Sequence, residues 1–216
     1  MEYRLLSYPL NKKTPTFGEM PPLRVRPLKR ISRGDSCNIS SVSFPNHLGT
    51  HIDAPRHFFD RGRPLSDYPI ADLIFTKPGI VDCPKKDDEF VTPEDLIATP
   101  EDLDLLLIST EFSRFRGQLR YQLHNPGLSP LTAEWLRANR PQLKALGIDA
   151  VSVSAFQRRE EGREAHRILL RPDSPILLIE DLDLSGDLEG LTKVFAVPLL
   201  VEGVDSMPCT VFGEFR

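Results

Sequence analysis

The sequence predicts a strand-rich α/β fold in a single domain. Many short segments are either continuously apolar or alternate between apolar and polar residues, as strands do, and the helical segments are few and short. A chain of 216 residues with 40% hydrophobic residues is long enough to bury a sizeable core, and domains of this size bury roughly 70% of their unfolded surface. No internal repeat or low-complexity tract interrupts this pattern.

The first half of the chain is expected to contain strands, one proline-rich loop and one short helix. Residues 9–22 hold four prolines and read as a loop. Residues 23–28 alternate apolar and basic side chains, which predicts a half-buried strand. Thr92, Pro93, Glu94 and Asp95 combine an N-cap, a proline at the first helical position and acids in the first turn, so a helix should begin there. Further strands are expected at residues 3–8, 41–53 and 79–83.

The second half begins with an almost continuously apolar run at residues 103–109, which predicts a central strand buried on both faces. Residues 110–130 lack a clear period; because long loops are often functional, we expect a covering loop. Residues 133–146 should be helical, interrupted by Pro141 and closed by Gly147. Strands are expected at 148–154, 175–179, 194–201 and 210–215, and a short helix at 163–170.

Three of the five histidines fall within residues 47–57. His47, His51, Asp53 and His57 are separated by even numbers of residues, and even spacing places side chains on one face of a strand. Helix is disfavoured there by Gly49, two β-branched residues and Pro55. We therefore expect a strand over residues 41–53 that leaves the sheet at Pro55, with His57 delivered from a turn.

Imidazoles and a carboxylate that converge on the gap left by Gly49 would suit a borderline divalent metal. The alternative is a polar strand face on which the histidines meet by chance. The three cysteines are far apart and lack a Cys-x-x-Cys spacing, so a closed thiolate site is not indicated.

The motif His47-x-Gly49-Thr50-His51-x-Asp53-x-Pro55-x-His57-Phe58 resembles the signature of the cyclase-family metal-dependent hydrolases, which include bacterial kynurenine formamidase and isatin hydrolase. The resemblance covers most of the chain. It implies a layered, strand-rich swivelling β/β/α-type domain over residues 1–216, a topology that the strand pattern alone does not define.

The same resemblance implies roles for individual residues. His47, His51, Asp53, His166 and Glu180 match the metal ligands of the family, with Asp53 and Glu180 as carboxylates that bridge up to two Zn²⁺ or Mn²⁺ ions. Taken alone, His166 would more often be a surface or packed residue, and Glu180 would mark the point where an apolar strand meets water.

His57 resembles the catalytic histidine of the family, and an imidazole with a pKa near 6.5 suits a proton relay. The alternative for His57 is structural packing against Phe58. Phe17 lies where the family carries an aromatic wall for substrate. With Phe112, Phe115 and Tyr121 it would line a pocket for a flat ring, although these aromatics would equally pack the loop onto the domain.

The expected function is therefore hydrolysis of an amide C–N bond by metal-activated water, in a small or cyclic amide or an aryl formamide resembling N-formylkynurenine or isatin. One alternative is a dehydratase or cyclase acting on a polyketide-like or sugar-acid substrate. Another is a non-catalytic, metal-stabilised binding protein.

Composition and charge limit which partners and which cellular location we expect for the chain. A net charge of −4 and a pI of about 5.8 provide no basic field for nucleic acid. No apolar run approaches the ~20 residues that span a bilayer, and the N-terminus does not resemble a signal peptide. Unpaired cysteines fit a reducing compartment. We expect a cytoplasmic homodimer or homotetramer that acts on a small molecule.

Overall fold

The computed structural model describes all 216 residues and is dominated by one curved, nine-stranded sheet. Along the sheet the order is β5-β12-β13-β4-β11-β10-β8-β6, and β1 pairs with β13. The strands are β1 Glu2–Leu5, β4 His51–Asp53, β5 Ile74–Phe75, β6 Pro78–Asp82, β8 Leu105–Ser109, β10 Ala145–Ile148, β11 Leu177–Glu180, β12 Leu191–Pro198 and β13 Ser206–Phe215. Neighbours from β6 to β11 run parallel, and the remaining pairs are antiparallel. Strand β12 approaches β6, so the sheet curls toward a barrel.

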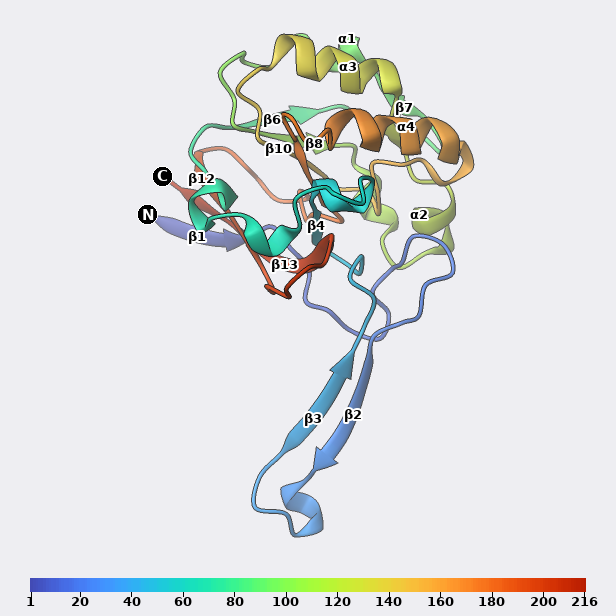
Figure 1. Cartoon of the computed structure of the whole chain (residues 1–216), viewed down its shortest axis with the longest axis vertical. Coiled ribbons are helices and arrows are strands. Elements are labelled where there is room, and N and C mark those ends of the chain that lie inside the picture. Colours follow the sequence, from blue (N-terminus) through green and yellow to red (C-terminus); the bar gives the residue numbers. More distant parts are fainter.

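Helices cover one face of the sheet (Figure 1). They are α1 Pro93–Leu96, α3 Pro130–Asn139 and α4 Arg159–Leu169, with α2 Leu119–Leu123 at the side. Two short strands, β7 Phe90–Val91 and β9 Gly127–Leu128, pair with each other in a separate small sheet. None of these helices is long and apolar enough to cross a membrane. The mixed, strand-rich α/β class predicted from the sequence is confirmed.

Strand β8 shows why its sequence is continuously apolar. Leu106 and Ile108 belong to the core beneath the helices, whereas Leu105 and Leu107 belong to the core on the other side of the sheet. All four side chains are fully buried. Because successive side chains of a strand point to opposite faces, a strand buried on both sides must be apolar at every position.

The prediction of one continuous strand over residues 41–53 is wrong. The segment forms two strands, β3 Ile39–Ser43 and β4, and residues 44–50 connect them in a turn. Gly49 has φ +64°, a left-handed conformation in which the strand cannot continue. A Cβ on Gly49 would lie 2.6 Å from Leu10 Cδ2 and 2.9 Å from Thr14 Cγ2, so the glycine is needed for this turn and its packing.

Three other expectations also need correction. The helix α3 ends at Asn139, because Pro141 cannot continue it, and residues 145–148 form β10 instead. Of the strand expected at 148–154, only Ile148 belongs to the sheet. The expected covering loop at 110–130 contains α2 and β9, and its aromatics Phe112 and Tyr121 are fully buried. The remaining expected elements are present within a few residues of their predicted bounds.

Strand β2 Arg24–Lys29 is a strand as predicted, but it is not half-buried. It pairs only with β3, and the two form a hairpin that extends away from the sheet (Figure 1). We call residues 23–43 the arm.

Gly49 offers a direct test of the turn that precedes β4. The substitution Gly49→Ala should destabilise the fold in two ways. A non-glycine residue in the left-handed conformation costs about 1–2 kcal/mol, and the steric clash of the added Cβ costs about 1–3 kcal/mol. We expect the free energy of unfolding to fall by about 2–5 kcal/mol in denaturant titrations. Gly203 is the matched control, because it has φ +78° and nothing within 4 Å of an added Cβ. Gly203→Ala should therefore show only the backbone cost; equal losses in the two variants would contradict the packing argument.

Candidate metal centre

The site is built on two adjacent antiparallel strands, β4 and β11. Their register places Glu180 opposite His51, and Leu178 opposite Asp53. His51 and Asp53 lie two residues apart on one face of β4, as the even spacing predicts. All three polar side chains are at least 97% buried, with exposed fractions of 3% for His51, 1% for Asp53 and 3% for Glu180.

His47 and His57 reach the same place from outside the sheet. The turn before β4 brings His47 Nδ1 to 3.0 Å from Asp53 Oδ1. His57 ends the 3-10 turn Pro55–His57, as expected for a residue delivered beyond Pro55. The ring centroids of His47 and His57 are 4.2 Å apart. The structure therefore brings these residues together, although His47 is not part of a strand.

The fourth imidazole, His166, comes from α4. Its Nδ1 lies 2.8 Å from the Gly162 carbonyl oxygen, and the Nδ1 of His51 lies 2.7 Å from the Gly49 carbonyl oxygen. Because a carbonyl only accepts, each Nδ1 must carry the hydrogen and each Nε2 is left with a free lone pair. These Nε2 atoms lie 3.4 Å and 3.3 Å from the two oxygens of Glu180.

The donor atoms fit a divalent metal ion. His51 Nε2 and both carboxylate oxygens of Asp53 are buried without a hydrogen-bond partner, a state that costs several kcal/mol for charged groups unless something else compensates. Asp53 belongs to two groups of ligand atoms that lie within 4.8 Å of one another, one with His47 and His51 and one with His57 and His166. Nitrogen and oxygen donors around a shared carboxylate are suited to transition metals.

The charged groups of the cluster shift one another's pKa values. Burial opposes charge on His47, but the attraction of Asp53 and the hydrogen bond to Asp205 raise its pKa to about 10. Burial opposes charge on Glu180 as well, yet the neighbouring imidazoles of His166 and His51 lower its pKa to about 2. At neutral pH, Glu180 thus stays ionised and His47 stays protonated.

Asp205 is a site residue that the sequence reasoning missed. Its Oδ2 lies 2.8 Å from His47 Nε2 and 2.8 Å from His57 Nδ1. The pairing of Ser206 with Asp53 positions it, since Asp205 then lies beside Ala54 and accepts a backbone hydrogen bond from Ala54 N at 2.9 Å. A lone acid after a glycine turn carries no sequence signal for this role.

A buried network behind Glu180 was also missed. Asp181 has φ +53° and accepts two hydrogen bonds from Arg116, at 2.8 and 2.7 Å, and one from the Tyr121 hydroxyl at 2.6 Å. Ser152 Oγ and Val153 N donate to Glu180 Oε1 at 2.9 and 2.8 Å. Together these contacts hold both the end of β11 and the carboxylate of Glu180.

A pocket of about 240 Å³ opens onto the cluster. Phe17, Met20 and Phe58 contribute its apolar wall, and Arg163 contributes a cation. Phe17 packs edge-to-face on Phe156, with ring centroids 5.4 Å apart. Phe112, Phe115 and Tyr121 do not line this pocket; Phe112 and Tyr121 form a separate small core with Val151, against which Phe115 packs. Of the four aromatics expected to line a pocket, only Phe17 lines this one.

Most of the chain matches the model of one known protein family. A model described as "Putative cyclase" matches residues 5–155, which include His47, His51, Asp53 and His57. The chain belongs to the cyclase family. Its matched part ends before His166 and Glu180, so the fold, not the family match, brings these two residues to the cluster.

Relatives in the cyclase family are distant. The chain is 26% identical over 184 residues to cyclase-like protein 3 of Oryza sativa subsp. japonica. This match covers 82% of this chain and 66% of the rice protein. It is 24% identical over 206 residues to kynurenine formamidase of Bordetella avium, covering 94% of this chain and 93% of that protein. The chain thus spans about two thirds of the length of the plant cyclase-like protein.

The cyclase-family fold is also seen in solved structures. Isatin hydrolase A from Labrenzia aggregata superimposes with a TM-score of 0.82 over 98% of this chain and 93% of that one, at 23% identity. At this identity the likeness establishes the shared fold.

Metal binding should be coupled to proton release. Metal ligands must be deprotonated. For each proton that the metal displaces, the apparent affinity for metal should therefore rise by about tenfold per pH unit as the pH approaches the His47 pKa of about 10. In the metal-free protein the raised histidine pKa values stabilise the fold fully below pH 6.5, and this contribution is lost as pH rises toward 10. Thermal melts from pH 6.5 to 9.5 should therefore show a falling Tm without metal and a growing stabilisation by added metal.

His51→Ala should abolish that stabilisation by metal. His124→Asn is the control, because His124 pairs with Asp88 at 3.1 Å outside the site. A Tm of the metal-free protein that rises over this pH range would contradict the assignment of protons to the cluster.

Proposed function

We propose that the protein is a metal-dependent hydrolase that cleaves an amide C–N bond in a small amide, a cyclic amide or an aryl formamide. The observation that carries this proposal is the position of His57, whose Nδ1 is held by Asp205 at the edge of the buried donor cluster. A titratable base beside a set of metal ligands, in a pocket, is the arrangement that hydrolysis requires. The names of the relatives, kynurenine formamidase and isatin hydrolase, support the same bond type.

The residues that would hold metal are His47, His51, Asp53, His166 and Glu180. We propose Zn²⁺, with Mn²⁺ as the second candidate. We propose up to two ions per chain, because Asp53 lies close to His47 and His51 in one group of donor atoms and to His166 in another. A bound ion of this kind lowers the pKa of water to about 7 and polarises a carbonyl. Ser152 Oγ and Val153 N orient Glu180 for its part in this set.

His57 would then move the proton. Its Nδ1–H donates to Asp205 at 2.8 Å, so Nε2 is the atom left free to accept. We propose that Nε2 takes up a proton during attack on the carbonyl and passes it to the leaving nitrogen. Asp205 fixes the tautomer and stabilises the imidazolium that forms, as an acid does behind a catalytic histidine. Through its second contact, at 2.8 Å to His47 Nε2, it also orients a proposed ligand.

The pocket supports a small substrate. Its volume of about 240 Å³ lies below the roughly 300–1,000 Å³ that is usual for drug-sized ligands. Phe17 and Phe58 present aromatic faces on which a flat ring would pack. We also propose a cytoplasmic location, which the three free cysteines support.

The proposal is tested by assaying the metal-loaded protein against N-formylkynurenine, isatin and simple cyclic imides. Hydrolysis should release formate from the first and open the ring of the others, and chelator should abolish it. Metal uptake without turnover on any amide, or turnover that eliminates water instead of consuming it, would contradict the proposal.

Variants of His57 and Asp205 separate proton transfer from metal binding. His57→Asn should keep its metal content and lose about 10²-fold or more in kcat, the typical share of general acid–base catalysis. Asp205→Asn, assayed with saturating metal, should lower kcat with little change in KM. Because Asp205 acts through His57, the double variant should be no slower than His57→Asn alone.

The surface variant His124→Asn provides the control for these kinetics. Two results would argue against the relay. Loss of metal from His57→Asn would make His57 a ligand, and multiplicative losses in the double variant would show that Asp205 acts independently of it.

A further inference from the structure

Helix α4 forms one wall of the pocket that opens onto the donor cluster, and it carries His166 into that pocket. Arg163 lies three residues before His166 on the same helix, and side chains three residues apart are neighbours on a helix surface. Arg163 is the only lysine or arginine that lines the pocket. The proposed reaction leaves this cation without a role.

Two further arginines continue the same side of α4. Arg159, Arg163 and Arg167 recur every four residues, which places them in one row along the helix. Arg159 lines a neighbouring hollow together with Phe17, which also lines the pocket. The guanidinium carbon of Arg167 lies 5.6 Å from the ring centroid of Phe58, another residue of the pocket wall. The row of three cations therefore borders the pocket.

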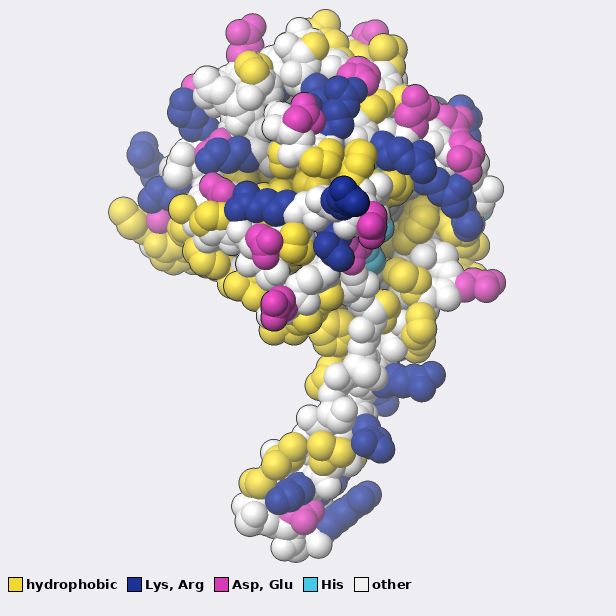
Figure 2. Space-filling model, in the orientation of Figure 1, with side chains coloured by type: hydrophobic (Ala, Val, Ile, Leu, Met, Phe, Trp, Pro, Cys, Tyr) yellow, Lys and Arg dark blue, Asp and Glu magenta, His cyan; other side chains and the backbone are white.

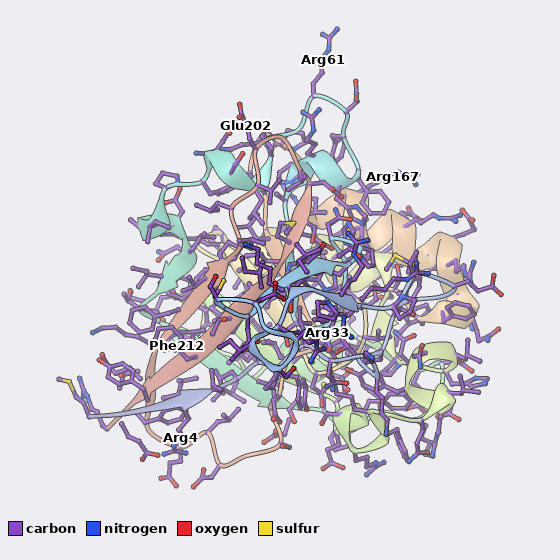
Figure 3. The ribbon with its side chains drawn as sticks, turned by 90° about the horizontal axis from the view of Figure 1, so that it is seen from below. Arg4, Arg33, Arg61, Arg167, Glu202 and Phe212 are labelled. Atoms are coloured by element: carbon purple, nitrogen blue, oxygen red, sulfur yellow. The ribbon has the colours of Figure 1, made fainter.

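The views of the molecule agree with this placement. Figure 2 shows Lys and Arg side chains gathered over α4, with a histidine side chain visible below them. Seen from below, Arg167 lies on the side of α4 that faces the loop carrying Arg61 (Figure 3). Arg61 follows the Pro55–His57 turn closely in the chain, so this side of α4 faces the segment that delivers His57.

The acids of α4 are turned away from the row. An α-helix rotates by about 100° per residue, so Arg159 and Arg163 lie within about 60° of His166 around the axis. By the same rotation, Glu161 and Glu164 lie about 140° and 160° from His166. The helix thus presents positive charge next to its pocket-facing side and negative charge to solvent.

Arg163 has one ion-pair partner, the carboxylate of Glu160. The side chains of Arg163 and Glu160 are 48% and 81% exposed, and Glu160 does not line the pocket. Because an exposed ion pair of this kind is weak, an anion that enters the pocket can replace Glu160 as the partner. A guanidinium offers two parallel N–H donors, which match the two oxygens of a carboxylate.

We propose that Arg163 binds a carboxylate of the substrate, so that the protein acts on amides that also carry a carboxylate group. Arg159 and Arg167 add to the positive field that draws such an anion to the pocket. The inference rests on the proposed function and names the substrate class of the same site. Because Arg163 contacts a part of the substrate that does not react, it should act on KM and leave kcat unchanged.

The test compares two formamides of nearly the same shape, meta-formamidobenzoate and meta-formamidobenzamide, as substrates of the metal-loaded protein. Wild type should show a kcat/KM about tenfold higher for the benzoate, the lower end of what a charge-assisted hydrogen bond contributes. Arg163→Gln should remove this preference by raising KM for the benzoate, with no change for the benzamide. Arg163→Lys should keep part of the preference, because it retains the charge without the paired donors.

Two further variants check the cause of this preference. Glu160→Gln should lower KM for the benzoate, because it removes the carboxylate that competes for Arg163. Arg114→Gln is the matched control: Arg114 forms a similar exposed pair with Glu111, at 3.0 Å, but does not line this pocket. Its kinetics on both formamides should equal those of wild type.

Calorimetric titration with the two products, meta-aminobenzoate and meta-aminobenzamide, makes the same comparison without turnover. Equal kcat/KM for the two formamides in wild type, with equal affinities for the two products, would overturn the inference and leave the proposed function standing. A benzoate preference that persists in Arg163→Gln would also overturn it, because another group would then hold the carboxylate. Failure to hydrolyse either formamide, with a preference for the aminobenzoate that Arg163→Gln removes, would contradict the proposed function and support the carboxylate site.

Discussion

Asp53 is the residue on which the site depends. It is a carboxylate with 1% exposure, placed mid-sheet between β11 and β13, and neither of its oxygens has a hydrogen-bond partner. A buried charge of this kind is tolerated only beside opposite charge or a metal. Protonated His47, whose Nδ1 lies 3.0 Å from Asp53 Oδ1, supplies that charge, and the surrounding imidazoles would supply lone pairs to a metal.

The fold brings the groups around Asp53 from five separate segments. His51 comes from β4, Glu180 from β11 and His166 from α4, while the turn at Gly49 supplies His47. Asp205 arrives with the start of β13. Strand β4 spans only three residues, so the chain leaves the sheet on both sides of Asp53, which allows the turn and the 3-10 segment to close around it.

The elements that follow from local pattern could be predicted, and those that depend on distant pairing could not. The apolar run of β8 indicates two-sided burial, and the helix expected from Thr92 and Pro93 is present as α1. Even spacing correctly placed His51 and Asp53 on one face, but not His47, since nothing in the alternation reveals the left-handed Gly49. Asp205 lies 158 residues from His47, and only the pairing of β13 with β4 brings them together.

The most direct test of the metal centre is anomalous diffraction at the zinc and manganese absorption edges, from crystals of protein purified without chelator. The account predicts one or two strong peaks enclosed by His47, His51, Asp53, His166 and Glu180, with Asp53 in contact with each. The absence of a peak at Asp53, or a fully occupied metal held instead by Asp205 and His57, would contradict it.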